Sequence, residues 1–299
     1  MTADRLELLG RPPQVSAPRR VLGRLAGYAR RDPIGAVAVA VMGAFILLAV
    51  AGPWITPDDP LSTNVNAILA APGTHGHLFG TDQLGRDTLS RLLAGTRPTL
   101  VAAVGSLLVG AAVGMVIGIV AGYVGGRADE VLMRLMDVLL AFPGLILALA
   151  IAAALGPGVR TLIIALAIPS IPAFARVIRQ ESRVVSGRAF VESAVAIGAT
   201  PRRVMWLHVF PNVVPILVIM CTTRLSFLIL LESTLSYLGV GIRPPAPDWG
   251  TVIADGASHL VVSQWQATIG GAVVFVCVLA VNIAGDSVRD ALDPRLRRQ

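Results

Sequence analysis

The sequence predicts an all-α membrane protein with six transmembrane helices, and three observations lead to this fold class. The 299 residues are 55% hydrophobic and only 14% charged, with a mean hydropathy of +0.73, whereas about 25% of the residues in an ordinary soluble protein are charged. Six apolar runs are long enough to cross the hydrocarbon core of a bilayer, which takes about 20 helical residues. The basic residues are spread very unevenly over the segments between these runs.

The six predicted spans divide the chain into tails, loops and a core. The spans are 34–52, 98–123, 131–155, 159–178, 209–231 and 267–285. The predicted units are a basic N-terminal tail at 1–33, an N-terminal anchor at 34–52, an outer loop at 53–97, a core of five helices at 98–285 with an inner loop at 179–208, and a C-terminal tail at 286–299. The lead before the first span is too long for most secretory signals, so we expect an uncleaved anchor.

The arginines predict the orientation of the chain. All 25 residues counted as Lys or Arg are arginine, and cytoplasmic segments of membrane proteins carry the excess of positive charge. With both termini in the cytoplasm, 19 arginines lie inside and five outside. The net charge of +7 therefore reflects topology and does not indicate a nucleic-acid partner. Without lysine the chain has no P-loop lysine and no Schiff-base chemistry.

The second predicted span carries a ladder of small residues. Ser106, Gly110, Gly114, Gly118 and Gly122 recur every four residues, which places them along one side of a helix. Small residues allow another helix to approach closely. We expect tight packing inside the bundle, with a gating contact as the alternative.

The inner loop 179–208 has the pattern of a hinged pair of short helices. Apolar residues recur at helical spacing between 189 and 197. Gly198 then favours a helix end, Thr200 suits a cap, and Pro201 suits the first position of a new helix. An exposed helix with an apolar face has to cover it against lipid or a partner protein.

Motifs in this loop and elsewhere resemble those of a known family. Glu192-Ser-Ala194, Gly198 and His208-Val-Phe-Pro211 resemble the EAA signature of the permease subunits of ABC importers. Segments 80–87, 232–239 and 285–295 resemble the dipeptide, oligopeptide and nickel subfamily, and the extra N-terminal span and long first outer loop match its C-type permease. Ser193 replaces the usual alanine, and His208 and Phe210 replace an isoleucine and a leucine.

The resemblance implies a type I ABC importer permease that is not itself an enzyme. Its expected partners are a homologous second permease, two ABC ATPase subunits or domains, an extracytoplasmic substrate-binding protein and membrane lipid, in a bacterial inner membrane. The residues expected to couple to the ATPase are Glu192, Ser193, Ala194, Gly198, Pro201, His208 and Pro211. The expected cargo is a small peptide; a dipeptide, an oligopeptide, a glutathione-like peptide and a nickel or other metal chelate all stay open.

Two further classes of protein are remote alternatives. An intramembrane zinc protease needs His-Glu-x-x-His on a span, and a serine enzyme needs serine and histidine at similar depth; the sequence has neither. An autonomous channel would need a filter motif or regularly placed pore charges. Neither alternative explains the hinged inner loop.

Charges within the spans mark candidate path residues, because a charged side chain at the bilayer centre is costly. Arg224 in the fifth span and Glu232 at its end are the candidates for the translocation path. For Arg224 a structural ion pair or snorkelling to the interface is the alternative, and for Glu232 a place at the interface. Asp137 is expected to make a helix–helix hydrogen bond.

No cofactor and no metal site is expected. His75 and His77 stand in the first outer loop and His259 in the last, and two histidines one residue apart make a poor site alone. The cysteines, Cys221 and Cys277, both lie in apolar runs, which does not suggest a disulfide or a zinc site.

Overall fold

The computed structural model describes residues 32–74 and 76–292. Within these ranges the secondary structure is helical and contains no β-strand. The α-helices are α2 (Pro33–Ile55), α3 (Thr88–Val124), α4 (Gly126–Leu140), α5 (Gly144–Leu155), α6 (Val159–Ser186), α7 (Ala189–Ala196), α8 (Pro201–Val204), α9 (Phe210–Tyr237), α10 (Trp249–Ala257) and α11 (Trp265–Leu292). A 3-10 turn, η2 (Val65–Ala67), lies between α2 and α3, and a π-helical stretch, η3 (Met205–Val209), joins α8 to α9. The predicted all-α fold is confirmed.

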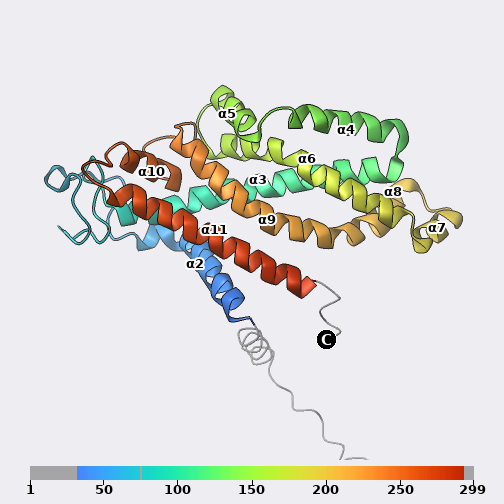
Figure 1. Cartoon of the computed structure of the whole chain (residues 1–299), viewed down its shortest axis with the longest axis horizontal. Helices are drawn as coiled ribbons and strands as arrows, with labels where there is room; N and C mark the ends of the chain where they lie inside the picture. Colours follow the sequence, from blue (N-terminus) through green and yellow to red (C-terminus); the bar gives the residue numbers. More distant parts are fainter. Residues whose placement is uncertain (1–31, 75, 293–299) are drawn as a thin grey trace, which may run out of the picture.

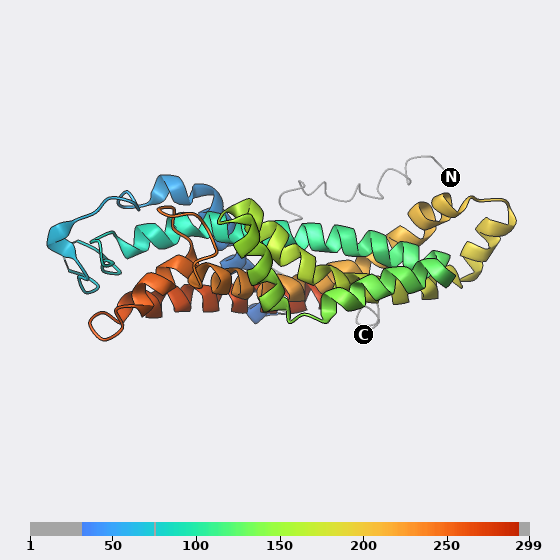
Figure 2. The same ribbon diagram turned by 90° about the horizontal axis from the view of Figure 1, so that it is seen from above.

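The long helices run lengthwise through an elongated bundle (Figures 1 and 2). Helix α7 lies at one extremity, and α10 lies at the other together with the segment between α2 and α3. We call these extremities the α7 end and the α10 end. Most of residues 1–33 and residues 293–299, which belong to the predicted tails, lie outside the described residues.

The apolar helices agree with a multi-pass membrane protein. In the described part of the chain, five helices are long and apolar enough to cross a membrane, and the pair α4–α5 makes a sixth if it counts as one span. Helix α3 has 37 residues, or about 55 Å at 1.5 Å per residue, so it exceeds the roughly 30 Å of a hydrocarbon core.

The third predicted span, over 131–155, is bent. Its two helices, α4 and α5, meet at an angle of 84°. The break falls at Pro143, which has no backbone N–H and disfavours helical geometry at the residue before it, Phe142. The segment therefore turns back on the bundle.

Two helices extend beyond their predicted ends. Helix α3 begins at Thr88 and not at residue 98, because Asp87 caps it: its Oδ2 accepts the backbone N–H of Ser90 at 2.7 Å. Helix α6 continues to Ser186 and not to residue 178. The connecting segments are therefore shorter than the predicted loops 53–97 and 179–208.

The small-residue ladder of α3 packs against α6, as predicted. A Cβ atom at Gly118 would lie 2.7 Å from the carbonyl oxygen of Ala175, and one at Gly110 would lie 3.2 Å from the Cβ of Ser170. The backbones of α3 and α6 approach closely only because these positions lack side chains.

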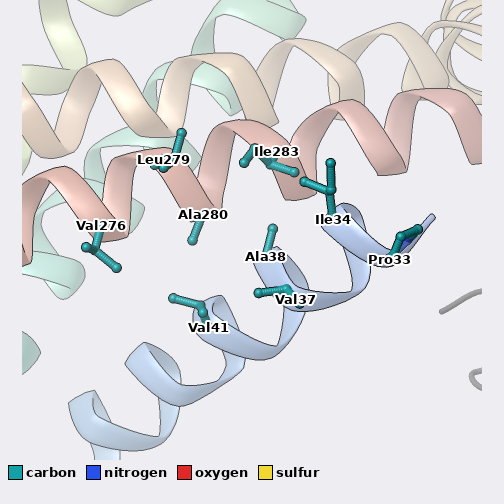
Figure 3. A pocket seen from close by; sticks show the side chains of 9 residues that line it. All are labelled: Pro33, Ile34, Val37, Ala38, Val41, Val276, Leu279, Ala280 and Ile283. Atoms are coloured by element: carbon teal, nitrogen blue, oxygen red, sulfur yellow. The ribbon is translucent and has the colours of Figure 1, made fainter.

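Helix α2 is the least buried of the spans. Only 11% of the most apolar 18-residue stretch of α2 is buried. A cavity of about 370 Å³ separates part of α2 from α11 (Figure 3). The cavity is lined by Pro33, Ile34, Val37, Ala38, Val41, Val276, Leu279, Ala280 and Ile283. The Oγ of Ser287 on α11 donates a hydrogen bond to Oδ2 of Asp32 at 2.8 Å. Apolar surface on this scale requires lipid or another protein around it.

Candidate functional site

Helix α7 forms the tip of the α7 end and carries both buried and exposed apolar residues. Val191 and Ala194 are buried, and Val191 joins an apolar cluster with residues of α3, α6 and α9. Phe190, Val195 and Ile197 are exposed, Ile197 by 87%. A rigidly anchored helix thus presents apolar side chains outward, which is typical of a docking surface for a partner.

The helix ends as the sequence predicts. Ile197 is the C-cap, and Gly198 follows with φ of +88°, in the left-handed region where glycine has no steric cost. Thr200 is the N-cap residue of α8 and Pro201 its first residue, although the Thr200 side chain makes no capping hydrogen bond.

The predicted second short helix is corrected. Helix α8 runs through the π-helical stretch η3 into α9, so that Pro201–Tyr237 forms one helical span and not a separate helix beside the membrane. Pro211 lacks the N–H that a regular helical turn would use, and the π-turn directly before it changes the register of the backbone hydrogen bonds.

The structure brings most of the predicted coupling residues to one tip. Glu192, Ser193, Gly198 and Pro201 are exposed there, and Ala194 is buried beneath them. The Oγ of Ser193 donates to the carbonyl of Ala189, within its own helix, at 2.8 Å.

The other two predicted coupling residues lie farther along the chain. His208 is half-buried in η3 and its ring lies 6.3 Å from that of Phe190, between centroids. Pro211 is exposed in the first turn of α9. His208 therefore has an aromatic neighbour on α7.

The two predicted path residues have different surroundings. Arg224 is half-buried on α9, and no carboxylate of the described residues forms an ion pair with it. Glu232 is fully buried and accepts hydrogen bonds from Ser236 at 3.3 Å and Ser233 at 3.4 Å. Glu232 thus lies inside the subunit, close enough to Asp248 for electrostatic interaction. The path role of both residues stays a prediction.

At the α10 end a buried ionic cluster holds the segment before α3 in place. Asp82 is fully buried and pairs with Arg86 at 2.6 Å and with Arg91. Arg91 also lies 2.9 Å from Asp255 on α10, and Arg86 3.4 Å from the same carboxylate. The 80–87 motif supplies half of this cluster, a role that the sequence did not reveal because Asp255 lies far along the chain.

Trp249 anchors α10 to the bundle. Its indole N–H donates to the carbonyl of Leu92 at 3.2 Å, and its ring meets Phe45 edge-on at 5.6 Å between centroids. Beside it, burial raises the pKa of the Asp248 carboxyl, which caps α10 by accepting the N–H of Thr251 at 2.6 Å.

Toward the α7 end, α4 is fastened to α6 by ion pairs. Asp129 is buried and binds Arg179 and Arg183. Asp137 accepts from Arg176 at 2.5 Å, which confirms the expected helix–helix hydrogen bond. Sequence reasoning missed Asp129, although the spacing of the arginines on α6 was a usable signal.

The bundle of long apolar helices defines the class of protein: a multi-pass membrane protein. Residues 114–298 match the family described as binding-protein-dependent transport system inner membrane component. The chain is 40% identical over 288 residues to the glutathione transport system permease protein GsiD of Salmonella paratyphi A, across 96% of this chain and 94% of the relative. It is 39% identical over 289 residues to GsiD of Escherichia coli O6:K15:H31, across 97% and 94%.

The fold also matches a solved structure of a transporter. A structure described as inward-facing conformations of the MetNI methionine ABC transporter aligns with a TM-score of 0.55 at 18% identity, across 67% of this chain and 94% of that chain. The chain belongs to the binding-protein-dependent transport system inner membrane component family and is a permease subunit of an ABC importer. It is a transport subunit and not an enzyme, and the family implies ATPase, binding-protein and second-permease partners.

Proposed function

We propose that this subunit forms half of the translocation path of an ATP-driven importer for small peptides, with the α7 end in the cytoplasm and the α10 end outside. Both termini then lie in the cytoplasm of a bacterium, whose inner membrane holds the complex. A homologous permease supplies the other half of the path, and a substrate-binding protein delivers cargo to the α10 end.

The observation that carries the coupling proposal is the exposed apolar surface that the anchored helix α7 presents at the α7 end. A partner that covers Phe190, Val195 and Ile197 would remove apolar surface from water. Because Val191 fixes α7 to α3, α6 and α9, a displacement of α7 by an ATPase would pass into the bundle as a rigid-body movement. Glu192, exposed in the first turn of α7, is placed to meet an ATPase arginine.

The cargo proposal is supported by the relatives named for glutathione transport, which match nearly the whole chain. A tripeptide carries carboxylates and an amine, and Arg224 offers a cation without a carboxylate partner in the described residues. We propose glutathione-like peptides and other short peptides as substrates. A nickel or other metal chelate is the alternative.

The coupling proposal is tested with two matched variants. Ile197→Asp places a charge on the outward face of α7, and Val261→Asp places the same charge at a position that is 98% exposed at the α10 end. We expect the wild-type subunit and Val261→Asp to co-purify with the ATPase in mild detergent and Ile197→Asp to lose it. Equal ATPase recovery in both variants would contradict the coupling proposal.

Orientation and cargo need separate measurements. Ser193→Cys and Val261→Cys, treated with a membrane-impermeant maleimide on intact spheroplasts, report which end of the subunit faces the outside. Labelling of Ser193→Cys alone would reverse the proposed orientation.

The cargo is tested by ATP hydrolysis. In proteoliposomes with the cognate binding protein, we expect glutathione or a dipeptide to stimulate ATP hydrolysis. Stimulation by a nickel chelate alone would favour the alternative cargo.

A further inference from the structure

Three potential metal ligands converge at the α10 end. The Nδ1 atom of His77 lies 3.0 Å from Oδ1 of Asp87 and 3.6 Å from Oδ2 of Asp58, and the three ligand atoms all lie within 4.8 Å of one another. The residues come from the segment after α2, from a turn and from the cap of α3. Their separation in sequence explains why the histidines alone predicted no site.

Among the described residues, His259 does not complete this group. His259 bonds instead to Ser258 and to the carbonyl of Asp255, through Nδ1, at 2.8 and 3.1 Å, and His75 lies outside the described residues. In the described residues, the partners of His77 are therefore two carboxylates and not a second histidine.

The ligands are held in place by a shared outer partner, Ser90. Oδ2 of Asp87 accepts both the backbone N–H and the hydroxyl of Ser90, each at 2.7 Å, so that Oδ1 is left for His77. The same Ser90 oxygen accepts the backbone N–H of Asp58 at 3.0 Å. Hydrogen bonds of this kind orient the ligands of metal sites.

The charge balance of the group favours a cation. The Asp87 side chain is 3% exposed, His77 12% and Asp58 51%. In the described part of the chain, neither carboxylate pairs with an arginine, whereas nearby Asp82 pairs with two. A buried carboxylate is stable when it is paired or coordinates a metal.

We propose that Asp58, His77 and Asp87 bind a divalent transition-metal ion of the Zn²⁺ type. Imidazole nitrogen and carboxylate oxygen bind Zn²⁺ at about 2.0–2.2 Å, and tetrahedral ligands at that distance lie roughly 3.4 Å apart, between the two separations measured from Nδ1. Mg²⁺ and Ca²⁺ prefer all-oxygen sites. Water fills the fourth position, and the ion joins the segment after α2 to the start of α3. The site does not depend on the proposed function.

The test measures metal binding directly. The complex, purified without a histidine tag and stripped with a chelator, is titrated with Zn²⁺ by calorimetry and with Co²⁺ by visible absorption. We expect one site on this chain, with affinity lowered roughly 100-fold in His77→Ala, since even outer partners of a metal site are worth 10–100-fold. The matched control His259→Ala should bind as the wild type does.

A second pair of variants guards against misfolding. Asp58→Asn changes a half-exposed ligand, and Asp59→Asn changes its exposed neighbour; we expect only the first to weaken binding. The proposal is overturned if wild-type protein shows no saturable binding up to about 100 µM Zn²⁺, which would leave only the polar contacts of His77 with the two carboxylates. It is equally overturned if Asp58→Asn and His77→Ala both bind like their controls.

Discussion

The seam between α3 and α6 makes a quantitative prediction for Gly118→Ala. The added Cβ would lie 2.7 Å from the carbonyl oxygen of Ala175, 2.8 Å from the Cβ of Ile178 and 2.9 Å from the backbone nitrogen of Arg179. Two of these three neighbours are backbone atoms of α6, which cannot rotate away. The two helices would have to separate along the ladder.

The expected cost follows from two opposing effects. Overpacking a close-packed site costs about 1–3 kcal/mol, while alanine gains up to about 1 kcal/mol over glycine in helix propensity. A matched control cancels the second effect: a Cβ at Gly271 on α11 would meet no atom within 4 Å. The difference in unfolding free energy between Gly118→Ala and Gly271→Ala should therefore be about 1–3 kcal/mol, with Gly271→Ala at or above wild-type stability.

The assay is reversible unfolding of the purified subunit in mixed micelles of a mild detergent and dodecyl sulfate, followed by helical circular dichroism. Each variant is titrated beside the wild type, so that the midpoints are compared at equal detergent. If Gly118→Ala unfolds at the same dodecyl sulfate fraction as Gly271→Ala, the close approach of α3 and α6 is refuted.

Three further predictions concern the α10 end. Asp82→Asn should lower the unfolding free energy by about 3–5 kcal/mol, because it removes one of the carboxylates that pair with two buried arginines. The control Asp59→Asn, at an exposed position, should change it by less than about 0.5 kcal/mol. The same micelle titration measures both variants, and equal midpoints would contradict the cluster's role. Trp249→Phe should cost about 0.5–1.5 kcal/mol through the lost indole hydrogen bond, because the Leu92 carbonyl keeps the Thr96 hydroxyl as a donor; the cost is read as a lower melting temperature, and an unchanged melting temperature would count against it. Since burial raises the pKa of Asp248 above its ordinary 3.8, the folded state holds that proton more tightly, so the Asp248 contribution to stability falls as pH rises above that ordinary value. Asp248→Asn should flatten that slope, and a slope equal to wild type would refute the assignment.

Much of the fold follows from local patterns that a sequence displays. The ladder from Gly110 to Gly122 predicted a close helix contact because small residues every four positions share one face of a helix. Gly198 and Pro201 predicted the end of α7 and the start of α8 because their backbone preferences are local. The break at Pro143 had a local signal too, but the continuous hydropathy of 131–155 concealed it.

The rest depends on partners that sequence spacing does not reveal. Arg86 and Asp255 are 169 positions apart, and only the packing of α10 on α3 brings them together. Glu232 is predicted as a path residue from its place at the end of a span, but its neighbours in the fold, two serines and Asp248, could not be read from the sequence. Hydropathy also underestimates the length of helices with polar ends, such as the last turns of α6, because their polar residues resemble those of a loop.

The packing of α7 determines how a displacement of this helix would be transmitted to the bundle if the coupling proposal holds. Val191 is buried in a cluster that includes Ile119 of α3, Ile178 of α6 and Val213 of α9. Burying a valine side chain stabilises a contact by about 1.5–3 kcal/mol. The close backbone contact of α3 and α6 leaves these two helices little room to move relative to one another. A displacement of α7 therefore either pulls Val191 out of this cluster, at that cost, or moves α3, α6 and α9 together. Transport requires the joint movement of the three helices. The glycine ladder lowers the free-energy cost of that movement relative to the loss of the cluster, because helices in backbone contact shift as one body.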